Sequence, residues 1–144
     1  MLGRFPFSTC AYLQQHHKLT ALPAKYLIPM FSKLSPFTAT QSSFNVKALY
    51  PPRSFPIKPN DFRVTVISGK KAVSKHAVYR RRASRRLKSA VEVIFPEQAP
   101  KGMDYIFYTN ANIVNLPWKD LLQQVSKAAG TIQHKISKRK KTSS

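Results

Sequence analysis

Residues 62–88, FRVTVISGKKAVSKHAVYRRRASRRLK, join a strand pattern to a basic helix pattern. The segment 62–68 is apolar and β-branched, which favours a strand. Gly69 interrupts this pattern. The stretch from Ser74 to Ile94 then predicts one helix, with Ser74 as its N-cap. Its apolar residues are spaced four, four and three apart and therefore share one face: Ala83, Leu87, Val91 and Ile94.

The segments around this unit complete a mixed α/β pattern. Phe44–Tyr50 alternates apolar and polar residues, so it predicts a strand that could pair with 62–68 as an antiparallel hairpin. Tyr105–Tyr108 is an apolar run that predicts a central strand. Trp118–Ala129 predicts a second helix, whose expected buried residues are Leu121, Leu122 and Val125.

Prolines and glycines predict where these elements end. Pro96 and Pro100 are expected to stop the first helix, because proline cannot donate a backbone hydrogen bond. Gly130 is expected to end the second helix. We therefore expect a folded domain over 36–130 and a basic tail over 131–144, which either extends the helix or frays.

The N-terminal segment has a different composition. No Asp or Glu precedes Asp61, and 1–35 mixes a few bases with hydroxyl and apolar residues. This composition is typical of an organelle transit peptide and predicts a mitochondrial matrix protein. A disordered basic arm that helps to bind RNA is the alternative.

The charge balance narrows the class of partner. The chain has 144 residues, with 25 Lys and Arg against 5 Asp and Glu, giving a net charge of +20. Such an excess indicates a polyanionic partner, either nucleic acid or an anionic membrane surface. No apolar run is long enough to cross a bilayer, so no membrane insertion is expected. Neither the single cysteine nor the four histidines are placed as metal ligands: Cys10, His16, His17, His76 and His134.

The basic residues concentrate between Lys70 and Lys88, where no acid occurs. On a helix, Arg81 and Arg85 are neighbours, and so are Arg82 and Arg86, and like charges at this spacing destabilise a helix. A bound polyanion would neutralise these charges, so we interpret the cluster as a nucleic-acid contact surface. The alternatives are a solvated helix face and a nuclear localisation signal. The predicted RNA-binding residues are Lys70, Lys71, Lys75, Arg80, Arg81, Arg82, Arg85, Arg86 and Lys88.

The order of these motifs resembles the protein subunit of bacterial-type ribonuclease P. That family has a strand with the motif R-x-G-x-x-V-S-K-K, and Arg63–Lys71 resembles it. The family's next helix begins with N-A-V-x-R-N-R, and the segment from His76 resembles that motif. Arg80 and Arg82 match the two arginines of R-N-R. Asp104–Phe107 resembles the later D-Y-V-F/I strand, and Leu116–Ala129 resembles the L-S-F-E-E-L helix.

The resemblance covers about Phe62 to Ala129 and includes departures. Arg81 and His76 stand where the family has Asn, and Ser84 replaces a Lys. Lys88-Ser89 stands where Arg-Glu is usual. These changes affect the fine geometry of the helix and leave its basic character.

The resemblance implies an α/β sandwich like the second domain of ribosomal protein S5, with a central mixed sheet and a left-handed βαβ crossover. It implies a subunit that binds ribonuclease P RNA and precursor tRNA while RNA-bound Mg²⁺ supports removal of the 5′ leader, with no small-molecule substrate. Phe44 and Tyr50 become candidates for an aromatic leader cleft, with ordinary core as an equal alternative for Phe44. Trp118, Tyr105 and Phe107 are expected to be core residues.

The chain has few groups suited to catalysis by the protein itself. Its acids are scattered, and no Ser/His/Asp arrangement is present: Asp61, Glu92, Glu97, Asp104 and Asp120. We therefore predict no catalytic residue and an accessory role beside a catalytic RNA. A mitochondrial ribosomal protein or ribosome assembly factor with the same fold is the main alternative. A DNA-binding module lacks a clear second recognition element, and an independent metal-dependent nuclease would need clustered acids.

Overall fold

The computed structural model describes residues 19–31, 33 and 35–143. The described elements combine helices and strands in one mixed α/β fold, with three strands in a row between α2 and α3. In chain order they are α2 (Ala24–Phe31), β1 (Phe37–Thr40), β2 (Phe44–Leu49), β3 (Arg63–Ile67), α3 (Ala77–Gln98), β4 (Asp104–Thr109), the 3-10 helix η1 (Ala111–Val114) and α4 (Trp118–Ser143).

The strands form a mixed sheet with the order β1-β2-β4-β3. β4 lies between β2 and β3, antiparallel to the first and parallel to the second. The predicted hairpin between 44–50 and 62–68 is therefore wrong, although both segments are strands. The β3–α3–β4 crossover places β4 beside β3, and β4 suits a central position because it is buried along most of its length. β2 instead forms a hairpin with β1, a strand that the sequence pattern missed.

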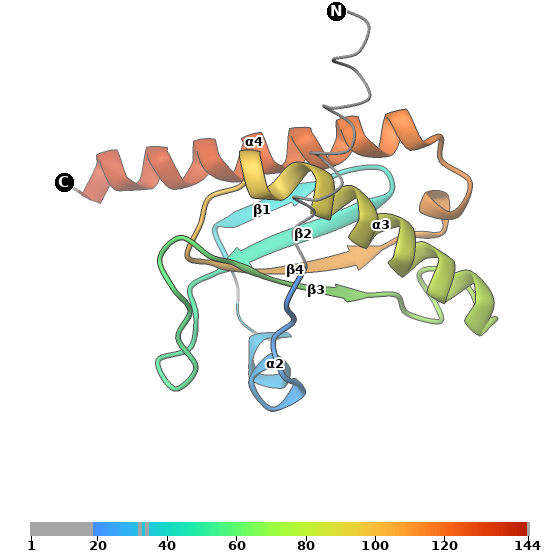
Figure 1. Cartoon of the computed structure of the whole chain (residues 1–144), viewed down its shortest axis with the longest axis horizontal. Helices are drawn as coiled ribbons and strands as arrows, with labels where there is room; N and C mark the ends of the chain where they lie inside the picture. The colour runs from blue at the N-terminus through green and yellow to red at the C-terminus, as the bar shows by residue number, and fades with distance from the viewer. Residues whose placement is uncertain (1–18, 32, 34, 144) are drawn as a thin grey trace, which may run out of the picture.

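The two faces of the sheet are covered differently. α3 and α4 pack together over one face, and the short helix α2 lies against the other (Figure 1). Phe44, Val46 and Ala48 of β2 point into the main core, as their alternation predicts. Leu49 and Ile106 belong to a smaller cluster on the α2 side. Tyr105 and Phe107 are buried in the main core, as expected.

The ends of α3 differ from the prediction. His76, and not Ser74, is the N-cap, and its side chain makes no capping bond. The Ser74 hydroxyl instead accepts a hydrogen bond from the His76 backbone N–H at 3.1 Å. The helix also continues through Pro96, because a proline so close to the end removes few helical bonds and the fully buried Phe95 holds the last turn on the core. The expected helix face is confirmed for Ala83, Leu87 and Val91.

α4 is much longer than the sequence predicts, because Gly130 does not end it. Its buried stripe continues from Leu121 and Val125 to Ile132 and Ile136, beyond the glycine. A glycine inside a helix costs about 1 kcal/mol relative to alanine. Burying two isoleucine side chains contributes more, at about 1.5–3 kcal/mol each. The segment after Gly130 is therefore an extension of the helix.

The N-terminal boundary of the folded domain also lies earlier than residue 36. Leu22 and Met30 are buried against Leu49 and Ile106. The chain before α2 is tied to β3, since the Val64 N–H donates to the Thr20 carbonyl at 2.8 Å. The described part of the predicted transit segment or arm is thus packed on the sheet, whereas 1–18 lie outside the described residues.

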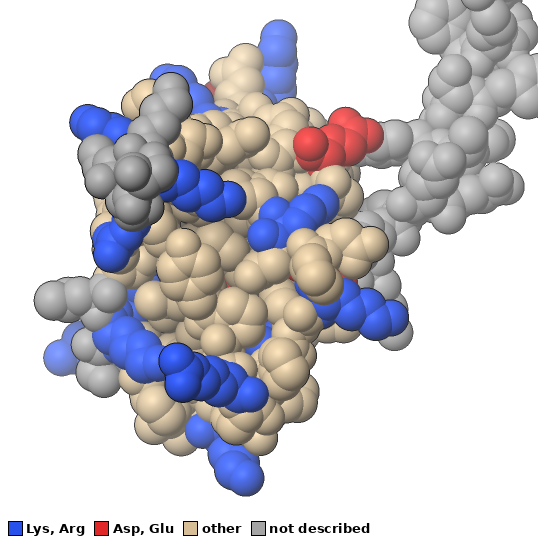
Figure 2. Space-filling model, turned by 90° about the vertical axis from the view of Figure 1, so that its left-hand side faces the viewer, with Lys and Arg blue, Asp and Glu red and all other residues tan. Residues whose placement is uncertain are grey.

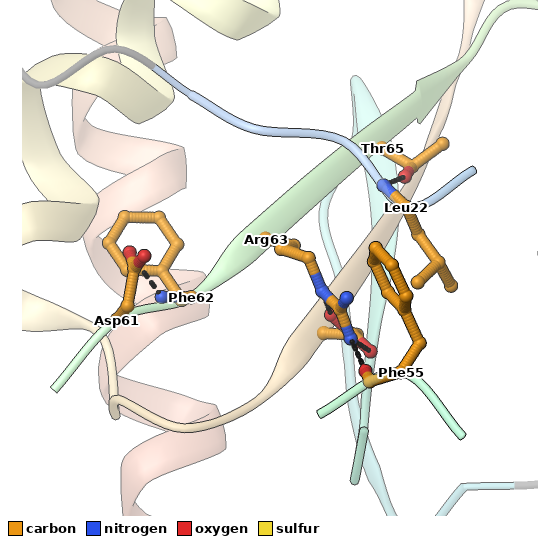
Figure 3. A network of polar contacts seen from close by, with 7 residues as sticks. Leu22, Phe55, Asp61, Phe62, Arg63 and Thr65 are labelled. Atoms are coloured by element: carbon orange, nitrogen blue, oxygen red, sulfur yellow. Dashed lines mark hydrogen bonds and ion pairs between the residues drawn. The ribbon is translucent and has the colours of Figure 1, made fainter. Parts of the chain in front are cut away.

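A buried ion pair joins the starts of the two parallel strands. Arg63 Nε donates to Asp104 Oδ1 at 2.6 Å, and Nη2 donates to Asp104 Oδ2 at 2.8 Å. Nη2 also donates to the Phe55 carbonyl at 2.9 Å, and the guanidinium lies 4.6 Å from the centroid of the Phe55 ring (Figure 3). This pair anchors the 50–62 loop to the sheet and fixes the register of β3 against β4.

Candidate nucleic-acid interface

The outer surface of α3 is basic because most of its apolar residues face the core, although Val78 and Tyr79 in its first turn are exposed. Ala83, Leu87 and Ala90 are fully buried, which leaves the opposite side of the helix in solvent. That side carries three exposed arginines, which we call the arginine face: Arg81, Arg82 and Arg85. With Val78 and Arg86 they line a shallow groove of about 360 Å³. Lys88 is also exposed, one turn further along.

Two of the predicted RNA-binding arginines also hold the protein together. Arg80 is half-buried, and its Nη1 donates to the carbonyls of Ser74 at 3.0 Å and Lys75 at 2.7 Å. Arg86 is half-buried, and its Nη1 donates to the carbonyls of Ile113 at 2.6 Å and Val114 at 3.0 Å. Arg86 Nη2 also contacts the Leu116 carbonyl. These bonds fix the loop before α3 and the η1 turn, a role that the charge pattern did not indicate.

The predicted lysines lie in the loop that leads into α3. Lys70, Lys71 and Lys75 are all exposed. This loop is held by the Ala111 N–H, which donates to the Ala72 carbonyl at 3.0 Å. The loop and the first turns of α3 lie at the same end of the molecule, so the lysines and the arginine face share one end (Figure 1).

A set of hydroxyl groups beside this surface was not predicted. The hydroxyls of Ser68 and Ser84 are 2.7 Å apart, and Thr109 Oγ1 donates to Ser68 Oγ at 2.7 Å. Ser68 and Ser84 line a small pocket of about 230 Å³ together with Arg80 and Arg81. Hydroxyl donors next to guanidinium groups suit a phosphate oxygen. The only sign of these hydroxyl groups in the sequence was that Ser84 stands where the family has a Lys.

The two candidates for an aromatic cleft lie in different environments. Phe44 is fully buried, with its ring centroid 5.6 Å from that of Phe107, so its ring cannot stack on RNA. The core alternative is the one that the structure bears out. Tyr50 is 62% exposed and follows Leu49, which pairs with Asp104 at the opposite end of the β2–β4 ladder from Thr109. Trp118, expected in the core, is 42% exposed because it occupies the outward side of the first turn of α4.

The sheet face on the α2 side presents another aromatic residue. Tyr108 is half-buried, and exposed Asn45 lies opposite it in the β2–β4 register. Lys47 Nζ lies 5.9 Å from the centroid of the Tyr108 ring. The same ammonium donates to the carbonyls of Met30 at 2.9 Å and Phe31 at 3.1 Å, which satisfies the C-terminal end of α2. Burial raises the pKa of Tyr108 and lowers the pKa of Lys47.

Two of the acidic residues, Asp104 and Asp120, have structural roles. Asp104 is occupied by Arg63, and Asp120 lies in the first turn of α4, where a carboxylate favours the helix dipole. Among residues 19–31, 33 and 35–143, no three His, Cys, Asp or Glu residues come together in a way that could hold a metal ion. In the same part of the chain, no helix has the length and apolar character needed to cross a membrane. The groups that the arginine face and its surroundings present are cations and hydrogen-bond donors.

Comparisons with known proteins give the family and a similar fold. A protein-family model described as Ribonuclease P matches residues 34–133. The Staphylococcus aureus RNase P protein superposes with a TM-score of 0.57 at 12% identity, over 78% of this chain and 93% of that one. The Thermotoga maritima RNase P protein gives a TM-score of 0.57 at 11% identity, over 79% and 96%. None of the curated protein sequences matches the chain.

Proposed function

Because the chain belongs to the ribonuclease P protein family and is a protein subunit of that RNA-binding, tRNA-processing enzyme, we propose that its arginine face binds the RNA partners. The partners of the family are ribonuclease P RNA and precursor tRNA. The family match over residues 34–133 favours this role over that of a ribosomal protein or assembly factor.

The observation that carries the proposal is the packing of α3. Its buried stripe fixes the helix on the core, so Arg81, Arg82 and Arg85 are presented to solvent from a rigid element. Each guanidinium can form two parallel hydrogen bonds to a phosphate, and each neutralised phosphate releases counterions. Lys70, Lys71 and Lys75 extend the positive surface at the same end. Arg80 and Arg86 support the surface by holding the loops beside it.

The single-stranded leader is best accommodated by the sheet face on the α2 side. Tyr108 offers a ring there on which a base can stack, and Asn45 beside it offers an amide for hydrogen bonding. Lys47 adds a positive charge near the ring. This assignment replaces Phe44, whose ring is buried on the opposite face.

Hydrolysis is assigned to Mg²⁺ held by RNA phosphates. No three described His, Cys, Asp or Glu residues come together, and Asp104 is paired with Arg63, so this set of donors does not fit a protein-held metal pair. The protein residues would bind and orient RNA. They would not themselves move protons at the scissile phosphate.

The compartment proposed is the mitochondrial matrix, on the strength of the acid-free N-terminal composition. Leu22 and Met30 are buried in the domain, so processing that keeps the domain intact must cut before Leu19. Imaging a fusion of residues 1–35 to a fluorescent protein tests this. A diffuse signal outside mitochondria would contradict it.

The RNA-binding role is tested with a double variant, Arg81→Gln with Arg82→Gln, and a precursor tRNA transcript that carries a 5′ leader. We expect weaker binding and a slope of log K against log salt that is shallower by roughly 1–2 units, since each lost phosphate contact contributes about 0.7–0.9. Lys119→Gln with Lys127→Gln removes the same charge from exposed positions on α4. Equal losses in the two double variants would contradict a specific arginine face.

The RNA partner is identified by immunoprecipitating the tagged protein from isolated mitochondria and sequencing the bound RNA. Enrichment of a ribonuclease P RNA and of 5′-extended tRNAs is the expected result. Enrichment of ribosomal RNA alone would contradict the proposed partners.

A further inference from the structure

The C-terminal half of α4 is a second basic element in a fixed position. Ile132 and Ile136 are buried, which holds this half of the helix on the domain. Lys135 Nζ donates to the Thr38 carbonyl of β1 at 2.6 Å, so the helix is also tied to the edge of the sheet. The bases that follow, Lys138, Arg139 and Lys140, are exposed. A rigid helix therefore presents them, where the sequence left a fraying tail possible.

Two of these bases, Lys138 and Arg139, line a groove that also contains an aromatic residue. The groove has a volume of about 330 Å³ and is lined by Pro36, Phe37, Lys135, Lys138 and Arg139. The Arg139 guanidinium lies 5.8 Å from the centroid of the buried Phe37 ring. Tyr50 meets the same ring edge-on, with centroids 6.0 Å apart. We call this site, together with Tyr50, the α4–β1 groove.

The charged residues that line the groove are all positive. No Asp or Glu occurs in α4 after Asp120. Figure 2 views this end of the molecule and shows Lys and Arg side chains around a surface of uncharged residues, with far fewer acidic atoms. Adjacent like charges on a helix repel, and a bound polyanion relieves that repulsion. The C-terminal end of α4 and the first turns of α3 lie at opposite ends of the molecule (Figure 1), so one short RNA segment cannot cover both the groove and the arginine face.

We infer that the α4–β1 groove binds a second, single-stranded segment of RNA. Lys138 and Arg139 contact successive phosphates, and a base stacks on the exposed ring of Tyr50. Positive charge along a groove with an aromatic platform beside it is the arrangement that binds single strands with little sequence preference. The inference goes beyond the proposed function, because it concerns a different surface and does not depend on the arginine face.

An RNA strand fits this surface better than an anionic membrane does. A membrane-binding helix presents an apolar face to the bilayer, whereas the apolar face of α4 is buried in the core. The exposed side of this half of the helix is polar and basic. The exposed ring of Tyr50 also lies beside a hollow and not on a protruding apolar patch.

The test uses the full chain and a labelled oligouridine of about twelve nucleotides, a length typical of single-strand sites. Lys138→Gln with Arg139→Gln is expected to weaken binding and to make the salt slope shallower by about 0.7 for each lost phosphate contact. Lys119→Gln with Lys127→Gln is the matched control, because it removes the same charge from the same helix. Equal losses in both would overturn the inference.

Substitutions at Tyr50 distinguish the contribution of base stacking to RNA binding from the contribution of charge. Tyr50→Ala is expected to weaken binding on the order of tenfold, whereas Tyr50→Phe keeps the ring and leaves binding nearly unchanged. Photocrosslinking with 4-thiouridine in the same oligonucleotide should label the peptide that contains Tyr50. Crosslinks confined to α3, with no effect of Tyr50→Ala, would overturn the inference.

Parallel measurements on Arg81→Gln with Arg82→Gln keep the two proposals distinct. If only the α3 variant weakens RNA binding, the groove fails while the proposed function stands. If only the α4 variant does, the groove stands and the arginine face fails. Binding that depends on Lys138 and Arg139 for phosphatidylglycerol vesicles, but not for oligouridine, would replace RNA by a membrane surface.

Folding is checked by thermal unfolding before binding is compared. Should the loss of Arg139 from the Phe37 ring unfold the protein, Lys138→Gln with Lys140→Gln removes the same charge and leaves that contact in place. Unchanged binding in this folded variant would overturn the phosphate contacts.

Discussion

Arginine occurs in two contrasting regions of this protein, the interior of the sheet and the outer face of α3. Arg63 is buried in the sheet, where one carboxylate and one carbonyl compensate for lost water. Arg81, Arg82 and Arg85 are exposed on α3. Arg80 and Arg86 are intermediate in exposure. Arg80 donates to a carbonyl in the loop before α3, and Arg86 donates to a carbonyl of η1. The contrast shows that position relative to the core decides whether an arginine stabilises the fold or is presented to a ligand.

The largest effect is expected at the buried pair. Asp104→Asn removes the charge that compensates Arg63, whose Nη1 is already buried without a hydrogen-bond partner among the described residues. Breaking a buried pair on one side costs about 3–5 kcal/mol, so we expect a loss of this size in the free energy of unfolding. Urea titration followed by circular dichroism measures it.

The exposed acid Asp120 provides the control for this prediction. Asp120→Asn makes the same chemical change in the first turn of α4 and should cost no more than about 1 kcal/mol. Adding Arg63→Met to Asp104→Asn should restore part of the stability, because it removes the uncompensated charge. Similar losses in Asp104→Asn and Asp120→Asn would show that the buried pair contributes little.

An intermediate effect is expected at Arg86. Arg86→Gln removes charged hydrogen bonds to the carbonyls of Ile113 and Val114 and should destabilise the protein by about 1–3 kcal/mol. The neighbouring variant Arg85→Gln should change stability by no more than about 0.5 kcal/mol, because Arg85 is exposed. Thermal unfolding of the two variants measures this difference in stability. Equal stabilities would place Arg86 with the arginine face.

The smallest effect, with the opposite sign, is expected on the arginine face. Arg81→Gln relieves repulsion from Arg85 one turn away and should stabilise the RNA-free protein by about 0.2–0.5 kcal/mol at low salt. The gain should disappear at high salt, where surface charges are screened. Arg53→Gln in an exposed loop is the control. A loss of stability in Arg81→Gln would mean that this arginine has a structural role.

The strand and helix segments were predictable because local patterns encode them. The alternation of Phe44–Tyr50 and the spacing of Ala83, Leu87 and Val91 survive in β2 and α3. The pairing of β2 was not predictable, since its partners β1 and β4 lie on either side and β4 comes much later in the chain. The predicted C-terminal ends of α3 and α4 were wrong for a related reason. Burial of Phe95, Ile132 and Ile136 overrides the local signals of Pro96 and Gly130.

The basic character of the interface was equally predictable. Which of its bases hold the fold together and which are exposed was not. The charge pattern placed nine bases in one segment, and the family resemblance gave them an RNA partner. Neither source distinguished Arg86 from Arg85, because the carbonyls that Arg86 holds come from η1, far along the chain. Nor did they separate Phe44 from Tyr50, two aromatic residues of one strand region with opposite exposure.

The sequence by itself determined the motif order that carries the family resemblance, most of the helices and strands, and the excess of positive charge, since each of these depends on residues close together in the chain or on composition. Tertiary structure alone decided which cations are exposed, which sheet face α2 packs against, and that the C-terminal bases lie on a helix held to the domain. Exposure depends on contacts between segments distant in sequence. Each such contact competes with local preference, and burial contributes enough free energy to win.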